Sequence, residues 1–180
     1  MEMINVTITY LELPSNDHLR PAILTDPDLT VIPAREPYPT FYRFLYAAVG
    51  EEVRWYKRLQ WPEDRLYAHL ARPALTILVL YWRGVPAGFL ELDAEGAEPG
   101  TEIGQFGIIP RFQGSGLGKH LLTVGVQYAF AQGASRVWLH TDTLDGPHAL
   151  ANYLARGFQI YRRQTIDEPV PPARGDLPRW

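Results

Sequence analysis

Hydrophobic and polar positions alternate at the start of the chain. From residue 4 to residue 10, apolar side chains are separated by asparagine and threonine, which is the period-two pattern of a half-buried strand. Residues 75–82 are apolar on both faces, as expected of a strand in the middle of a sheet. The turn signal Arg83-Gly84 follows, and 85–92 is predicted to return as the next strand.

The second half of the chain alternates between strand-like and helix-like segments. Strands are predicted over 101–109, 136–141 and 158–166. One helix begins near Leu117, because apolar residues then recur at helical spacing, and it ends before Gly133. A second helix is predicted over 147–156.

The segment between the first two strands is less regular. Residues 14–40 are rich in proline and aspartate and show no period, so an irregular connection with room for one short helix is expected. Helices are predicted over 41–59, divided at Gly50, and over 62–71, with proline in the first turn. The resulting order of strands and helices predicts an α/β fold, in which a mixed sheet carries helices on both faces.

Composition and charge narrow the class of protein. The 180 residues, of which 46% are hydrophobic, fit one domain over 1–168 followed by a proline-rich tail over 169–180. A net charge of -3 argues against binding to nucleic acid. The longest apolar run, 74–82, is too short to span a bilayer, and the N-terminus lacks the pattern of a signal peptide. We therefore expect a cytoplasmic protein with no membrane partner.

The absence of cysteine removes disulfides, thiolate metal sites and a covalent cysteine nucleophile. His140 and Asp142 share one face of a predicted strand, which is a pattern that metal ligands can use. Two ligands without a third at suitable spacing make a weak metal site, so no metal is expected.

A glycine-rich turn between a predicted strand and a predicted helix is the most informative segment. Its residues are Gln113, Gly114, Ser115, Gly116, Leu117, Gly118 and Lys119. Alternating glycines let the backbone turn tightly and expose successive N–H groups. The helix start adds unpaired donors and the positive end of the helix dipole. Together these features predict a site for phosphate or diphosphate.

Two well-known phosphate motifs do not match this turn. A nucleotide P-loop needs serine or threonine where this chain has His120, and a wider spacing before Gly118. The dinucleotide fingerprint fails because the glycines fall at every second position. Two alternatives stay open on the residues alone: a structural turn with no ligand, and a nucleotide-binding phosphotransferase.

The turn resembles the Q/R-x-x-G-x-G/A signature of the GNAT superfamily of N-acetyltransferases. The fixed positions are occupied by Gln113, Gly116 and Gly118. The preceding segment 106–110 resembles the fourth strand of that family, and 153–158 matches its Y-x-x-x-G-F ending. The likeness covers residues 74–166.

The resemblance implies a GNAT-like fold whose central, mostly antiparallel sheet splays apart at the fourth strand. Acetyl-CoA is the implied co-substrate, and its pantetheine arm would lie in the gap and pair near Ile108 as an extra strand would. Gly107 is the expected bulge residue. The backbone N–H near Phe106 would meet the thioester carbonyl as the oxyanion donor.

One departure from the family pattern concerns the helix before the final motif. Many members carry asparagine seven residues before the tyrosine, whereas this chain has Gly146, preceded by Asp145. A different cap is therefore expected at this helix, and Asn152 is the candidate substitute for cofactor contact.

The implied reaction transfers an acetyl group to a primary amine by direct attack in a ternary complex, so the ammonium must lose a proton and the thiolate gain one. Tyr153 aligns with the family's tyrosine and is the candidate acid; the alternative is a core aromatic. Glu102 is the candidate base, and strand alternation places it on the face of Phe106. The two are about 13 Å apart along the strand, so a water relay, or the reach of the long glutamate across a bulge, is expected. Glu91 and His140 are the reserve bases, and a solvated charge at a strand start is the alternative for Glu102.

Aromatic side chains gather in the helical region that covers the acceptor site in relatives. They are Tyr38, Phe41, Tyr42, Tyr46 and Trp55. A neutral aromatic pocket would suit a small-molecule amine or an amino-acid-like acceptor, although most aromatics at this spacing belong to a core. A homodimer is left open. The competing function is a noncatalytic acyl-CoA-binding regulatory module on the same fold.

Overall fold

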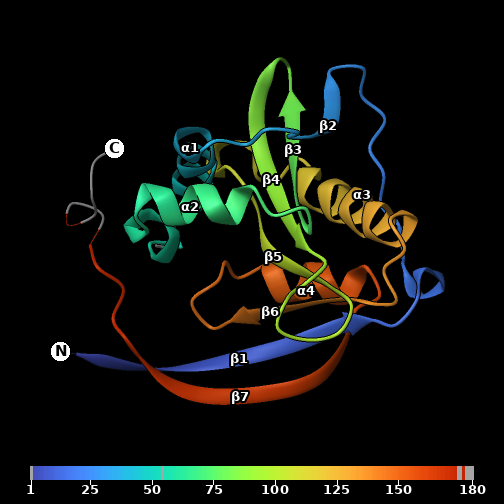
Figure 1. Ribbon diagram of the computed structural model, residues 1–180. Helices are drawn as coiled ribbons and strands as arrows, with labels where there is room; N and C mark the ends of the chain where they lie inside the picture. Colours follow the sequence, from blue (N-terminus) through green and yellow to red (C-terminus); the bar gives the residue numbers. More distant parts are fainter. Residues whose placement is uncertain (1, 54, 174–175, 177–180) are drawn as a thin grey trace.

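The computed structural model describes residues 2–53, 55–173 and 176, so half of the predicted tail over 169–180 lies outside the described residues. Within them, seven strands form one mixed sheet in the order β2-β3-β4-β5-β6-β1-β7 (Figure 1). The strands are β1 (Met3–Leu13), β2 (Leu29–Pro33), β3 (Leu75–Trp82), β4 (Val85–Asp93), β5 (Thr101–Ile108), β6 (Val137–Asp142) and β7 (Gln159–Pro169). The helices are α1 (Pro39–Val49), α2 (Glu63–Leu70), α3 (Leu117–Ala131) and α4 (Ala149–Ala155), with short 3-10 helices η1 (Asn16–His18), η2 (Lys57–Gln60) and η3 (Pro110–Phe112).

The central hairpin follows the sequence pattern closely. β3 has the predicted bounds, and β4 pairs with it in antiparallel fashion. The turn between them places Arg83 at φ 52° and Gly84 at φ 81°. Two successive residues in the left-handed region are the mark of a tight two-residue hairpin turn, which confirms the predicted turn.

Two local expectations were wrong. The connection expected to be irregular contains the short edge strand β2, which pairs with β3. The helix expected after Gly50 is a turn followed only by η2. The side chain of Trp55 packs onto Gly50, so close that a Cβ at that glycine would overlap it, and its backbone N–H donates to the carbonyl of Gly50 at 3.1 Å. This close return of the chain is incompatible with a continuing helix.

Each face of the sheet carries its own hydrophobic core. One core lies between the sheet and α3 and includes Leu90, Ile103 and Leu121. The other lies against α1 and α2 and includes Tyr42, Leu66 and Phe89. Helices therefore cover both faces, as predicted (Figure 1). No helix in the described part of the chain combines the length and the apolar character needed to cross a bilayer.

The sheet opens between β5 and β6. These strands are parallel and pair only over Thr101–Ile103 and Val137–Leu139, although both continue further. The predicted splaying at this strand is therefore confirmed. The bulge is not at Gly107, which pairs regularly with Phe89. Instead the register shifts between Ile103 and Gln105, which leaves Gly104 as the extra residue.

The chain closes on itself at the other end of the sheet. β1 lies between β6 and β7 and is antiparallel to both, so the first and last strands pair along their length (Figure 1). This pairing supports β6 from the side away from the opening. The pairing of β6 with β1 thus helps to hold the end of β6 away from the free edge of β5.

Candidate functional site

A cavity of about 910 Å³ occupies the opening in the sheet. Its wall is formed by the start of α3, the edge of β5, the end of β6 and α4. The segment from α1 to η2 closes its far end, together with Glu168 and Pro171. Elements from widely separated parts of the sequence therefore meet where the sheet splits.

The glycine-rich turn forms one wall of this cavity. Gly114 and Gly116 have φ angles of 80° and 82°, which a residue with a side chain adopts only at a cost. Gly116 is the N-cap of α3, and no side chain caps the helix there. The first N–H groups of α3 are therefore available to a ligand, at the positive end of the helix dipole. Lys119 adds a full positive charge to the same wall.

The space beside these glycines fits a phosphate-bearing ligand. A Cβ atom at Gly116 would lie 3.0 Å from Cε of Lys119, so a side chain there would crowd the cradle. At Gly118 a Cβ atom would lie 3.6 Å from Ile108 and 3.8 Å from the side-chain amide nitrogen of Asn152. Bare glycines keep the backbone donors accessible, which is what binding of a diphosphate requires.

All the predicted cofactor contacts except Ser115 line the cavity. Ser115 is exposed, and its hydroxyl donates to the carbonyl of Phe112 at 2.7 Å, which closes the turn. Gln113 lines the cavity, but its side-chain amide donates to the carbonyl of Ile108 at 3.1 Å. That hydrogen bond ties the turn to the edge of β5 and sets the position of the cradle relative to the strand.

Tyr153 reaches the cavity from α4. It is 6% exposed, and its ring lies 6.0 Å from those of Phe106 and Phe158. Burial and then the charge of Asp145 raise the pKa of Tyr153 well above its usual value. Its hydroxyl therefore keeps its proton at neutral pH and is available as a donor.

The start of α4 confirms that a different cap is used. The N-cap is His148, with no side-chain hydrogen bond. Asp145 instead accepts hydrogen bonds from the Thr141 hydroxyl at 2.5 Å and from the backbone N–H of Asp142 at 3.2 Å. Asp145 therefore organises the turn after β6, and Gly146 lies bare along the cavity wall.

Glu102 does not lie on the predicted face of β5. Its neighbour Ile103 packs with Phe106 in the core beneath α3, so Glu102 points to the opposite side. The extra residue at Gly104 reverses the alternation between Glu102 and Phe106. Glu102 is absent from the residues that line the cavity.

The loop before β5 covers the carboxyl group of Glu102. A Cβ atom at Gly96 would lie 2.7 Å from its Oε2, and the backbone N–H of Ala97 donates to it. Burial, followed by the charge of Asp93, raises the pKa of Glu102 to about 7. On its other side Oε1 lies 3.6 Å from Nδ1 of His140, a residue of the cavity wall. A carboxyl group with a pKa near neutrality can exchange a proton at physiological pH.

Glu91 is buried behind the bulge, on the face away from α3. Its carboxylate accepts hydrogen bonds from the Tyr42 hydroxyl at 2.6 Å and from Arg58 at 3.1 Å, and His69 lies at 3.3 Å. Burial alone would raise the pKa of Glu91, but these partners outweigh it and hold the pKa below its usual value. Glu91 is therefore a structural anchor for β4 and the bulge, and a poor proton acceptor.

Replacing Glu91 with leucine is expected to lower the free energy of unfolding by about 3–5 kcal/mol, because Arg58 would keep a buried charge without its partner. Urea denaturation measures this. The matched control is Glu95→Leu, since the Glu95 side chain is 77% exposed and lies 3.9 Å from Arg72; it should cost less than about 1 kcal/mol. Similar losses in both variants would show that the Glu91 cluster is not an anchor.

Aromatic side chains cover the far end of the cavity. Of the predicted cluster, Tyr46 and Trp55 line it. Tyr42 is fully buried in the core beside α1, and Phe41 packs against that core, whereas Tyr38 is 59% exposed. Tyr46 and Trp55 also belong to that core or pack against it, so most of the cluster is core, as the helical spacing indicated.

Carboxylates gather at the same end. The cavity wall there includes Glu52, Asp142, Asp145 and Glu168. Lys57 lies beside them, and its ammonium nitrogen is 3.2 Å from Glu168, so carboxylates outnumber ammonium groups among the described residues of this wall. Sequence reasoning missed Glu52, Lys57 and Glu168, because they come from a turn, η2 and an edge strand that no local pattern connects. Among the described residues, no group of three or more His, Asp or Glu side chains is arranged to hold a metal ion.

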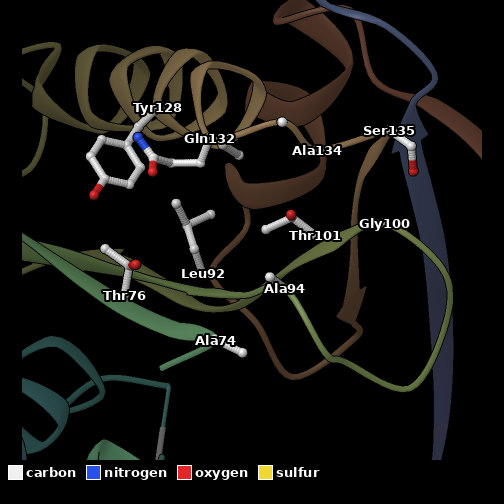
Figure 2. A pocket seen from close by; sticks show the side chains of 12 residues that line it. Ala74, Thr76, Leu92, Ala94, Gly100, Thr101, Tyr128, Gln132, Ala134 and Ser135 are labelled. Carbon is white, nitrogen blue, oxygen red and sulfur yellow. The ribbon is translucent and has the colours of Figure 1, made fainter. Parts of the chain in front are cut away.

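A smaller pocket of about 260 Å³ lies at the other end of α3 (Figure 2). Thr76, Thr101 and Gln132 contribute to its wall, and the described residues around it include no charged side chain. The C-terminal end of α3 borders this pocket, where the helix dipole is negative. Neither feature suits a phosphate, so the cavity at the start of α3 is the candidate site.

Comparison with known proteins identifies the family of the chain. The family model "Acetyltransferase (GNAT) family" matches residues 43–158. The mycothiol acetyltransferase of Streptomyces scabiei (strain 87.22) is 38% identical over 74 residues, which are 41% of this chain and 24% of that protein. The match therefore spans about a quarter of the length of this curated relative.

Solved structures share the fold at low sequence identity. A GCN5-related N-acetyltransferase from Kribbella flavida has a TM-score of 0.64 and 19% identity, over 98% of this chain and 63% of that one. An aminoglycoside acetyltransferase from an uncultured soil metagenomic sample has a TM-score of 0.58 and 20% identity, over 73% of this chain and 88% of that one. The matched family model covers more than half of the sequence, including the glycine-rich turn and the opened sheet. The chain belongs to the acetyltransferase (GNAT) family.

Proposed function

We propose that the chain transfers an acetyl group from acetyl-CoA to a primary amine of a small-molecule acceptor, by direct attack in a ternary complex. The observation that carries this proposal is that one cavity joins the glycine cradle of α3 to the gap between β5 and β6. A coenzyme A thioester has a diphosphate at one end and a narrow, amide-bearing arm at the other. The diphosphate would bind in the glycine cradle, and the arm would lie in the gap.

The residues at each end of the cavity have distinct parts in this proposal. The turn over Gly114–Lys119 would bind the diphosphate through backbone N–H groups, with Asn152 beside it. The arm would lie along the free edge of β5 near Ile108. The backbone N–H near Phe106 would donate to the thioester carbonyl. When bound, acetyl-CoA supplies an activated acyl carbon.

Groups around the thioester end of the cavity would transfer the protons. Tyr153 keeps its proton at neutral pH and would donate it to the leaving sulfur. Glu102 has a pKa of about 7 but does not reach the cavity, so it would act on the amine through an intervening group. With no cysteine in the sequence, a covalent thioester on the protein is excluded, which favours direct attack.

The acceptor end favours an amine. The four carboxylates of the far wall attract a protonated amine, and Tyr46 and Trp55 offer ring faces to an organic cation. A small acceptor fits a cavity of about 910 Å³ that also has to hold a thioester arm. The proposed catalytic domain comprises residues 1–168, with 169–180 as a tail.

A thiol-release assay with acetyl-CoA tests the proposal. The acceptors are putrescine, spermidine, tyramine, ethanolamine and L-lysine, each over a range of concentrations. We expect saturable release of coenzyme A with at least one amine, and an acetylated product of matching mass. Tight coenzyme A binding with no turnover would favour a regulatory module, and stabilisation by ATP but not by acetyl-CoA would favour a phosphotransferase.

A further inference from the structure

We propose that His140 takes the proton from the acceptor amine, and that Glu102 is the positioning residue behind it. This inference rests on the proposed function and assigns the proton path within the same site. It explains how a carboxyl group outside the cavity contributes to a reaction inside it.

The geometry places His140 between Glu102 and the cavity. The side chain of His140 is 46% exposed and lines the cavity, whereas that of Glu102 is 16% exposed. Nδ1 of the imidazole lies 3.6 Å from Oε1 of Glu102. Because Nδ1 faces the carboxyl group, Nε2 is the ring nitrogen left for an acceptor. A proton leaving the cavity toward Glu102 meets the His140 ring first.

A stack of side chains on β1 and β7 supports the His140 ring. His140 pairs with Tyr10 across β6 and β1, and the two rings are 5.7 Å apart. The guanidinium of Arg162 lies 3.7 Å from the Tyr10 ring centroid and donates to Glu98 at 2.6 Å. The imidazole is therefore backed by a packed surface rather than by solvent, which limits its rotation.

The charges that face His140 suit a proton acceptor. Burial lowers the pKa of His140, so the ring is neutral at physiological pH; Asp142 and Asp145 oppose this effect, and Lys57 and Arg162 add to it. Glu102 also faces the ring. Once the ring has gained a proton, the nearby carboxylates stabilise the imidazolium.

The proton balance of the step is complete. Nε2 of His140 takes one proton from the acceptor ammonium, which leaves a neutral amine. As the C–N bond forms and the C–S bond breaks, the electron pair of the C–S bond stays on sulfur, and Tyr153 gives sulfur its proton. The second proton released from nitrogen restores the Tyr153 hydroxyl through solvent, and the imidazolium returns its proton to solvent.

Histidine NMR titration tests the pairing without any acceptor. The imidazole resonances of His140 are followed against pH in the wild type, in Glu102→Gln and in Glu102→Asp, after circular dichroism has confirmed the fold of each. Because the pKa of Glu102 is about 7, its ionisation should appear as a step near pH 7 in the wild-type His140 resonances; Glu102→Gln should remove this step, and Glu102→Asp should weaken it. His18 hydrogen-bonds with Ser15 on the surface, so its resonances are the internal control and should be the same in all three proteins. An unchanged His140 titration in both variants would overturn the pairing.

Kinetics with the fastest amine of the panel separate His140 from Glu102 as the proton acceptor. His140→Gln should lower kcat by about 10²–10⁴-fold, leave the affinity for coenzyme A unchanged, and abolish the acidic limb of the pH–rate profile. Glu102→Gln should keep that limb, because the imidazole that titrates there is still present. The double variant should be no slower than His140→Gln, because the two residues act as one unit.

The opposite pattern would contradict the assignment. If His140→Gln kept the acidic limb and Glu102→Gln removed it, Glu102 would be the base, acting through water. His18→Gln serves as the control for loss of a histidine and should match the wild type. Absence of turnover with every amine would count against the proposed function, whereas the NMR result would still decide the pairing of His140 with Glu102.

Discussion

The variant Gly116→Glu is expected to bind coenzyme A at least about 100-fold more weakly than the wild type. The glutamate Cβ would lie 3.0 Å from Lys119, so its side chain would crowd the cradle. Its carboxylate would also place negative charge at the N-terminal end of α3, where the diphosphate is expected. Isothermal titration calorimetry with acetyl-CoA measures the loss.

The other end of α3 provides a matched control for this substitution. Gly133 also has a positive φ, 93°, and a Cβ there meets nothing within 4 Å. Gly133→Glu therefore carries the same backbone cost, about 1–2 kcal/mol, and the same change of charge. It should bind acetyl-CoA as the wild type does. Equal affinity of the two variants would show that the turn is not the binding site.

Replacing Tyr153 with phenylalanine is expected to have a large effect on kcat. The ring contacts with Phe106 and Phe158 do not need the hydroxyl, so fold and acetyl-CoA affinity should be retained. Loss of the proton donor should lower kcat by about 10²-fold or more. Thiol release at saturating acetyl-CoA and saturating amine gives this value.

A tyrosine outside the cavity controls for loss of a hydroxyl. Tyr128 lies on α3 and packs against the core beneath that helix. Tyr128→Phe should leave kcat within about twofold of the wild type. If Tyr153→Phe also retained its rate, sulfur would take its proton from another donor, and Tyr153 would be a core aromatic.

Local sequence signals predicted the features that depend on neighbouring residues. The apolar run of β3, the turn at Arg83-Gly84 and the glycine cradle all follow from short-range patterns, because backbone conformation there is set within a few residues. The same holds for Tyr153, which a helical spacing and a short motif place on α4. These elements account for the cofactor end of the proposed site.

Features that depend on pairing between distant segments could not be predicted in this way. One extra residue at Gly104 reverses which side of β5 faces α3, and it moves Glu102 away from Phe106. No residue type signals the bulge, since Gly104 and Gly107 are equally good candidates. The insertion of β1 between β6 and β7 likewise rests on long-range pairing, and it is this pairing that backs His140 with Tyr10.

The sharpest single test is a crystal structure of the protein grown with excess acetyl-CoA. The diphosphate should lie within hydrogen-bonding distance of the backbone N–H groups at the start of α3, with the thioester between β5 and β6 next to Tyr153. An ordered coenzyme A molecule bound elsewhere, with the cradle of residues 113–118 empty, would contradict the proposed cofactor site.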